Sequence, residues 1–142
     1  MADGSMSTAE REDFLSDVHV GVLAISQRAK GPLALPVWYR FRGGEVLIEM
    51  DGRSLKARLL REAGRATVTA QSEAPPYKYV SIEGPVVVDD LQPDDLEMAT
   101  RYLGAEMGKR YDENNPRTEN SVVVRLKPER WRTMDFGKLM GG

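Results

Sequence analysis

The sequence predicts a mainly β fold, an antiparallel barrel or tightly curled sheet with helices on its outside. Strand-like apolar runs outnumber helical patterns, and most neighbouring runs are joined by short turns. Short turns between successive strands favour antiparallel pairing. The longest run, residues 77–91, contains Gly84-Pro85. Because proline cannot donate to a central ladder, this pair marks a bend, and bends let a sheet curl into a barrel.

The first half of the chain predicts one helix followed by three strands. Ser7 and Glu10 form a capping-box pattern, which predicts a helix at about residues 8–16. Apolar runs predict strands at residues 19–25, 33–41 and 45–50. The last two are joined through Arg42-Gly43-Gly44, because glycine reaches the positive φ that tight hairpins need.

A second helix follows over residues 55–63. Leu55, Leu59 and Ala63 share one helical face, Ser54 is placed to cap its start, and Gly64 to end it.

The second half predicts two strands, a helix and two more strands. The strands lie at residues 65–71 and 77–91, then at 121–127 and 131–136. Between them, Pro93-Asp94-Asp95 opens a helix whose apolar face is formed by Leu96, Ala99, Leu103 and Met107, widened by Met98 and Tyr102. Gly104 and Gly108 weaken this helix and permit close packing. Residues 112–120 form a polar loop, and residues 137–142 are expected to fray.

The totals fit one ordinary globular domain. Of 142 residues, 41% are hydrophobic and 30% charged, with a net charge of −2. A net charge this small creates no strong electrostatic attraction to nucleic acid or membrane, so neither is expected as a partner. The chain has no cysteine, which excludes disulfides and fits a cytoplasmic protein. Residues 1–6 look like a disordered, tag-like start, so we expect residues 7–142 to form the single domain.

The start of the helix at residues 55–63 is a candidate anion site. A helix N-terminus attracts anions, yet Lys56 and Arg58 lie there against the dipole preference. A phosphate held by Ser54, Lys56 and Arg58 would remove the conflict. The alternative, that both cations are solvated surface side chains, stays open.

Few groups in the chain predict protein-borne catalysis. The single histidine, His19, is expected to be structural or solvated, and with no cysteine a metal site is not expected. Trp38 and Tyr39 are adjacent on a strand, so one faces the core while the other covers a ligand or a partner. If the protein is an enzyme, a cofactor carries its chemistry.

Four segments in order resemble the pyridoxamine 5'-phosphate oxidase-like family of split β-barrel proteins. They are residues 21–24 (GVLA), 35–39 (LPVWY), 54–60 (SLKARLL) and 75–84 (PPYKYVSIEG). Within that family they look like the actinobacterial branch that uses the deazaflavin coenzyme F420. The resemblance implies an antiparallel split β-barrel of the FMN/F420-binding type. It also implies a homodimer with the cofactor at the subunit interface.

The resemblance further implies which residues bind the cofactor. Pro36, Val37 and Trp38 would lie along the ring, and Ser54, Lys56 and Arg58 would hold the phosphate. Further contacts would come from Gln71, Lys78 and Tyr79, with Ser81 as an additional candidate. FMN oxidases of the family commonly have Arg and Gln where this chain has Pro36 and Tyr79, which argues against a pyridoxamine phosphate oxidase. No catalytic residue is implied.

The function implied is that of a reductase. Reduced F420 would deliver a hydride to an electron-poor conjugated small molecule, similar to biliverdin, a quinone or an enone. The alternatives are an FMN-binding oxidoreductase and a non-enzymatic protein that binds F420, a flavin or haem.

Overall fold

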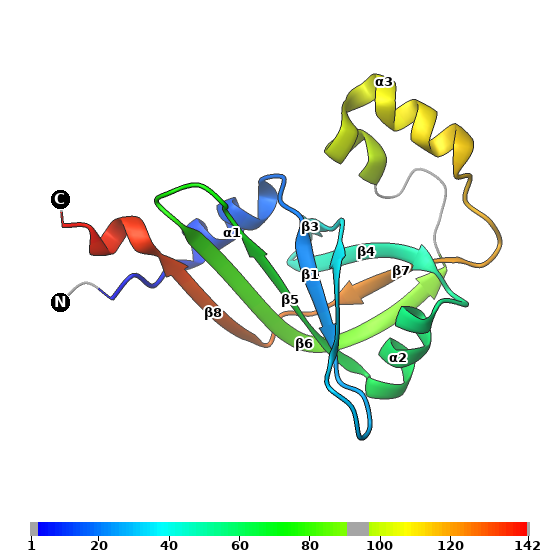
Figure 1. The fold of residues 1–142 in the computed structure, drawn as a ribbon, viewed down its shortest axis with the longest axis horizontal. Coiled ribbons are helices and arrows are strands. Elements are labelled where there is room, and N and C mark those ends of the chain that lie inside the picture. Colours follow the sequence, from blue (N-terminus) through cyan, green and yellow to red (C-terminus); the bar gives the residue numbers. More distant parts are fainter. Residues whose placement is uncertain (1–2, 91–96, 142) are drawn as a thin grey trace.

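A computed structural model describes residues 3–90 and 97–141 (Figure 1). In order, its elements are α1 (Thr8–Ser16), β1 (Gly21–Ile25), β2 (Leu33–Val37), β3 (Arg40–Arg42), β4 (Glu45–Asp51), α2 (Leu55–Ala63), β5 (Arg65–Gln71), β6 (Lys78–Asp90), α3 (Met98–Asn114), β7 (Ser121–Leu126), β8 (Arg130–Asp135) and the short 3-10 helix η1 (Phe136–Leu139). The predicted helix start at Pro93–Asp95 and the face residue Leu96 lie outside the described residues.

The strands form one curled antiparallel sheet. Its hydrogen-bonded order is β2-β1-β5-β6-β7-β4-β3, with β8 paired to β6. The two ends of this path, β2 and β3, are consecutive in the chain and are separated by Trp38 and Tyr39. β2 pairs with β1, whereas β3 pairs with β4. The predicted antiparallel split β-barrel with flanking helices is therefore confirmed.

The prediction of one continuous strand over residues 33–41 is wrong. The chain changes its strand partner at Trp38 and Tyr39, so no single ladder spans the segment. The first strand also begins at Gly21 rather than at His19. Splitting the long strand in this way opens the barrel between β2 and β4.

The predicted interruption at Gly84-Pro85 is present as a second change of partner. Before it, β6 pairs with β8 as far as Glu83, and after it β6 pairs with β7 from Val86. A Cβ at Gly84 would collide with the backbone carbonyl of Lys127. Only glycine therefore lets the passing chain come this close.

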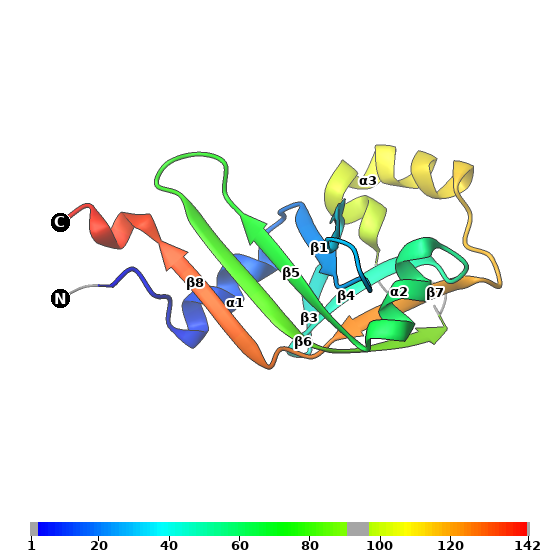
Figure 2. The ribbon, with the colours of Figure 1, turned by 60° about the horizontal axis from the view of Figure 1, so that its bottom comes forward.

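The interior of the barrel is apolar and closed by helices. Its fully buried side chains include Leu15, Leu23, Ile25, Tyr39, Ile48, Leu60, Ile82 and Leu126. α1 begins with the predicted capping box of Ser7 and Glu10, and it packs against β3. Both views show α1 near the same end of the molecule as the N- and C-terminal segments (Figure 2). Residues 3–6 lie along β8, where Gly4 O accepts from Asp135 N at 2.7 Å.

The caps of α2 are as predicted, but its inward face is not. Ser54 accepts from Ala57 N, and Gly64 ends the helix in the left-handed conformation. The buried residues are Ala57, Leu59 and Leu60, whereas Leu55 is 48% exposed. The helix is rotated relative to the predicted face, because the short side chain of Ala57 turns toward the barrel.

α3 is broken at Gly104, whose φ of 85° and ψ of 171° are not helical. Met107, predicted on the inward face, is therefore 56% exposed, because the break turns the distal half of α3 (residues 105–114) away from the first half's periodicity. The helix also extends to Asn114, into the predicted polar loop. Residues 136–139 form η1, so the prediction that the chain frays from Gly137 onward is wrong there.

Candidate functional site

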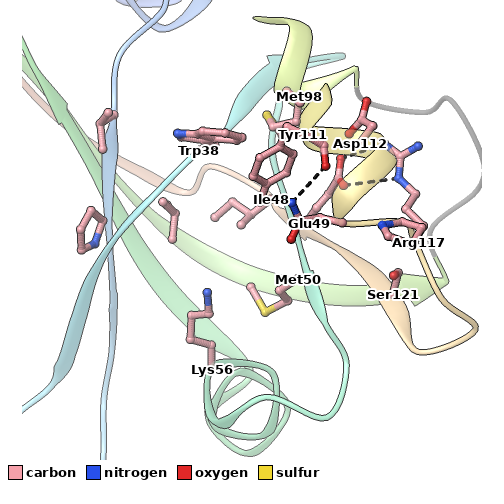
Figure 3. Close-up of a pocket in the computed structure, with 16 residues that line it drawn as sticks. Trp38, Ile48, Glu49, Met50, Lys56, Met98, Tyr111, Asp112, Arg117 and Ser121 are labelled. Carbon is pink, nitrogen blue, oxygen red and sulfur yellow. Dashed lines mark hydrogen bonds and ion pairs between the residues drawn. The ribbon is translucent and has the colours of Figure 1, made fainter. Parts of the chain in front are cut away.

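A cleft of about 430 Å³ lies where the barrel splits between β2 and β4. Figure 3 shows it between Trp38 and the β4 residues, with α2 below and α3 above. Its lining residues are Val20, Pro36, Val37, Trp38, Ile48, Glu49, Met50, Lys56, Met98, Ala99, Tyr111, Asp112, Asn115, Pro116, Arg117 and Ser121. A volume in this range suits a cofactor or drug-sized ligand.

The two long walls of the cleft come from strands that do not pair with one another. Pro36, Val37 and Trp38 form one wall at the end of β2, and Ile48 and Met50 of β4 form the other. Tyr39 points the opposite way and is fully buried in the core, as the alternation of a strand predicts. The cleft therefore has extended backbone and apolar side chains on both sides, which is a surface suited to a flat ring.

Lys56 supplies a positive charge at the bottom of the cleft. It belongs to the first turn of α2, and Figure 3 shows its side chain rising into the cleft. Within the described part of the chain, no carboxylate forms an ion pair with it. A lysine at a helix N-terminus places its charge beside the unpaired N–H groups of the first turn. Together they form an electropositive corner that fits a phosphate.

Ser54 and Arg58 do not line the cleft. The Ser54 hydroxyl oxygen caps α2 by accepting from Ala57 N at 3.2 Å. Arg58 Nε lies 3.9 Å from Glu62 Oε1, and both side chains are about two-thirds exposed, at 68% and 66%. Of the predicted phosphate ligands, Lys56 alone reaches into the cleft from its side chain.

The rim opposite β2 is polar. Arg117 Nη2 lies 3.1 Å from Glu49 Oε2, and this ion pair is largely shielded from solvent. Asn115 Nδ2 donates to the backbone carbonyl of Tyr111 at 3.0 Å, which leaves the amide oxygen of Asn115 as an acceptor. Asp112 adds a carboxylate from the distal half of α3. The cleft thus joins an apolar slot to a polar end.

Two tyrosines of α3 hold the ring of Trp38. The Tyr102 ring stacks on it at 5.0 Å with an interplanar angle of 8°, and the Tyr111 ring lies 5.3 Å away at 52°. Burial raises the pKa of the Tyr102 hydroxyl above its usual range, so it remains protonated at neutral pH. Trp38 is therefore a fixed wall of the cleft.

The remaining predicted residues lie away from this cleft, on β5 and β6. Tyr79 is opposite Gln71 on one side and Met134 on the other. Lys78 Nζ is 4.0 Å from Asp135 Oδ2, and the Ser81 hydroxyl pairs with Thr69 at 2.8 Å. The nine predicted cofactor contacts are thus divided, with Pro36, Val37, Trp38 and Lys56 in the cleft and the others outside it.

His19 also lies outside the cleft. Its ring stacks on Phe14 at 4.2 Å, and its Nε2 is buried without a partner. Burial lowers the pKa of His19 below its usual value, which favours the neutral ring. Its position is structural.

Several cleft residues were not predicted as site residues. Glu49, Tyr111, Asp112, Asn115 and Arg117 come from β4, the distal half of α3 and the following loop. Their only sequence signal is the spacing of Gly104 and Gly108, which marks a helix that folds back on itself. Among residues 3–90 and 97–141, no three His, Asp or Glu side chains gather as metal ligands, and no helix is long and apolar enough to cross a membrane.

Comparison with known proteins gives one family and a set of similar folds. The sequence profile described as pyridoxamine 5'-phosphate oxidase matches residues 7–135. The conserved hypothetical protein Rv2991 from Mycobacterium tuberculosis is 28% identical, with a TM-score of 0.79 over 98% of this chain and 91% of its own. No curated protein matches the sequence.

Two further solved structures share the fold at lower identity. A protein described as an F420 reductase is 21% identical, with a TM-score of 0.61 over 85% of this chain and 94% of its own. An FAD and haem binding protein from Mycobacterium smegmatis is 17% identical, with a TM-score of 0.65 over 92% of this chain and 71% of its own.

Proposed function

Because this chain belongs to the pyridoxamine 5'-phosphate oxidase family, we propose that its cleft binds a flat, phosphate-bearing redox cofactor, the deazaflavin F420. The observation that carries the proposal is the ammonium group of Lys56, which faces the cleft beside the wall of Pro36, Val37 and Trp38. Among the residues that the structure describes, no carboxylate is paired with it. The solved structure described as an F420 reductase makes the deazaflavin the first cofactor to test.

The residues present fit such a group. Lys56 and the first-turn N–H groups of α2 would bind the phosphate. The Ser54 oxygen accepts from Ala57 N, which leaves its hydroxyl hydrogen free to donate to the same anion. Arg58 lies on the exposed side of α2, where it would meet only the outer part of an extended anionic tail. The ring would lie along Pro36 to Trp38, between the two apolar walls.

We propose that the protein acts as a reductase. When bound in its reduced form, the cofactor supplies a hydride to an electron-poor conjugated small molecule, such as a quinone, an enone or a biliverdin-like tetrapyrrole. The contribution of the chain is to bind the phosphate, orient the ring against Trp38 and exclude water from the apolar slot. The polar rim, where Asn115 and Asp112 offer acceptor oxygens, would orient the second molecule.

We also propose that the active form is a homodimer. Strand register places Val22, Pro36, Thr69 and Ser81 in one row on the outer face of β1, β2, β5 and β6. The neighbouring row adds Ala24, Ala34 and Thr67. These side chains are small and uncharged, and Val22 is 43% exposed. The second row ends on β6 at Glu83, which is paired with Arg130. We call this surface the outer β face; it suits a second copy of the chain.

A dimer through the outer β face would also account for the divided set of predicted residues. Gln71 and Tyr79 share this side of the sheet at the end of β5 and β6. Tyr79 lies six positions before Pro85, where β6 bends, so about 20 Å of extended strand separates Tyr79 from the bend. In the proposed dimer, Gln71 and Tyr79 of one chain approach the cleft of its partner. Lys78 alternates to the other side of β6, with Val80 and Ile82, and is not explained in this way.

The test of the cofactor is a titration of the purified protein with F420, FMN, FAD and haem, followed by absorbance and fluorescence. The expected result is tightest binding of F420, with binding weakened by competing inorganic phosphate. Retention of FMN or FAD without any binding of F420 would instead support the flavin-dependent alternative.

A non-enzymatic binding protein is the second candidate. It is favoured by the position of two possible acid–base residues, since Glu49 is paired with Arg117 and His19 lies outside the cleft. Single-turnover oxidation of bound reduced cofactor by a series of quinones and enones separates the two functions. The reductase proposal expects at least one acceptor to be reduced faster on the protein than in buffer, and a storage protein would accelerate none.

A further inference from the structure

Tyr102 of α3 inserts into the strand ladder where the barrel splits. Continuing the register of β1 and β2 beyond Gly21 and Val37 places His19 opposite Tyr39. Instead of a direct bond between them, the Tyr102 hydroxyl accepts from Tyr39 N at 2.9 Å. The same hydroxyl lies 2.7 Å from His19 O and 2.9 Å from Tyr39 O, and donates its single hydrogen to one of them. A side chain thus takes the place of a strand partner.

Arg101, the residue before Tyr102, anchors this insertion. Arg101 donates from Nε to Tyr39 O at 3.3 Å and from Nη2 to Asp17 O at 2.8 Å. Its Nη1 donates to Ser16 O at 3.2 Å. Arg101 therefore ties the first half of α3 to the segments before β1 and after β2, and Tyr102 is held in one place between them.

The ring of Tyr102 acts on the cleft at the same time. It stacks on Trp38 at 5.0 Å with an interplanar angle of 8°. The hydroxyl fixes the backbone next to Trp38, and the ring fixes the face of its indole. The side chain of Tyr102 is not itself among the residues that line the cleft, so it acts only through Trp38.

We propose that Tyr102 is the positioning residue of the cleft: it holds the ladder open between His19 and Tyr39 and sets Trp38 as a rigid wall for the cofactor ring. The part that concerns the ring rests on the proposed function, while the part that concerns the ladder does not. A tyrosine that only fills the core would still stack on Trp38, but its hydroxyl would have no role at the split.

The test compares Tyr102→Phe with Tyr111→Phe. Both tyrosines contact Trp38, but the structure gives backbone hydrogen bonds to the Tyr102 hydroxyl alone. The first measurement is amide exchange at Tyr39. Loss of a hydrogen bond is expected to speed exchange about tenfold in Tyr102→Phe, with no change in Tyr111→Phe. Exchange at the wild-type rate in Tyr102→Phe overturns the proposal.

The second measurement reports on Trp38 without any cofactor. The chain has two tryptophans, so Trp131→Phe leaves Trp38 as the single emitter. In that background, Tyr102→Phe is expected to shift Trp38 emission and increase its quenching by acrylamide, because the backbone beside the indole is freed. Unchanged emission and quenching overturn the role of the Tyr102 hydroxyl in setting Trp38 as a rigid wall. A urea unfolding curve checks that each variant is folded.

The third measurement separates ring binding from phosphate binding. Tyr102→Phe is expected to weaken F420 or FMN about fivefold to tenfold while inorganic phosphate binds as before. Faster exchange at Tyr39 with unchanged cofactor affinity would make Tyr102 purely structural and overturn the positioning role. If the wild-type protein binds none of these cofactors, the proposed function fails. Amide exchange at Tyr39 and the emission of Trp38 then still decide the role of Tyr102.

Discussion

At the residue scale, Lys56 and Arg58 are two cations of one helix with different surroundings. Lys56 faces the cleft, whereas Arg58 lies on the exposed side next to Glu62. Residues two positions apart differ by about 200° around a helix axis. A phosphate in the cleft therefore meets Lys56 directly and Arg58 only at a distance.

We expect Lys56→Ala to weaken binding of F420 or FMN by about 10-fold to 100-fold, since a charge-assisted hydrogen bond contributes about 1.5–3 kcal/mol. Fluorescence titration at low salt measures the change. Arg58→Ala is the matched control, and because its exposed pair with Glu62 contributes little, its affinity should stay within about twofold. Equal losses of affinity in the two variants would show that the phosphate does not bind in the cleft beside Lys56.

His19 gives a prediction about pH. Burial is the largest cause that lowers the pKa of His19, and the charge of Asp17 opposes it. The unfolded chain therefore takes up this proton more readily than the folded protein. Stability is fully present above the ordinary value of 6.5 and falls as the pH drops below it.

Urea unfolding at pH 7.5 and at pH 5.5 measures this difference. The wild type is expected to be less stable at the lower pH, and His19→Asn should lose most of the dependence because the chain has no other histidine. Carboxylates such as Glu10, with a pKa lowered to about 2, respond only at more acidic pH. An equal pH dependence in His19→Asn would show that another group is responsible.

At the element scale, α3 is a helical hairpin built on two glycines. Gly104 makes the turn, and Gly108 lets the distal half lie against the first half. A Cβ at Gly108 would come within 2.7 Å of Thr100 Cα and 2.8 Å of Thr100 N. This contact sets where Tyr111 and Asp112 stand above the cleft.

Gly108→Ala is therefore expected to destabilise the protein by about 1–3 kcal/mol, because the added methyl meets backbone that cannot move aside. It should also weaken cofactor binding by displacing Tyr111 from Trp38. Gly31→Ala serves as the control, since a Cβ there has no atom within 4 Å. Urea unfolding and a cofactor titration compare the two, and equal stability would contradict the close contact between the halves of α3.

The elements that local patterns determine could be predicted, and those that depend on distant partners could not. The capping box at Ser7 and the caps of α2 involve neighbours in sequence, and they are present as predicted. The division of residues 33–41 into β2 and β3 depends on which strands lie alongside, and on Tyr102, which is 63 positions from Tyr39. The face of α2 likewise depends on how closely Ala57 approaches the barrel.

At the scale of the whole molecule, the outer β face is the feature on which the proposed dimer rests. In the proposed dimer it is covered by a second chain, which also brings Gln71 and Tyr79 toward the cleft. The resemblance to the family groups those residues with the cleft residues as one site. A single sequence could not predict which of them would belong to a second chain.

We expect the wild-type protein to sediment at twice its 15.9 kDa chain mass. Val22→Glu should yield monomers with weaker cofactor binding, because it places a charge between the uncharged residues Pro36 and Thr69. Val87→Glu is the control, since Val87 is similarly exposed, at 37% against 43%, but pairs with Arg125 in another part of the sheet. Dissociation by both substitutions, or by neither, would place the interface elsewhere.

The barrel is closed by the peptide chain rather than by a last pair of strands. The two ends of its hydrogen-bonded path, β2 and β3, are joined directly in the chain by Trp38 and Tyr39. Asp135 N donates to Gly4 O at 2.7 Å, so the backbone near the two ends of the chain lies close enough for a linker to make a circular permutant. In such a permutant, new ends opened at residues 38–39 would preserve every strand ladder but cut the chain connection that closes the barrel. New ends in the exposed loop at residues 28–30 would leave that connection intact.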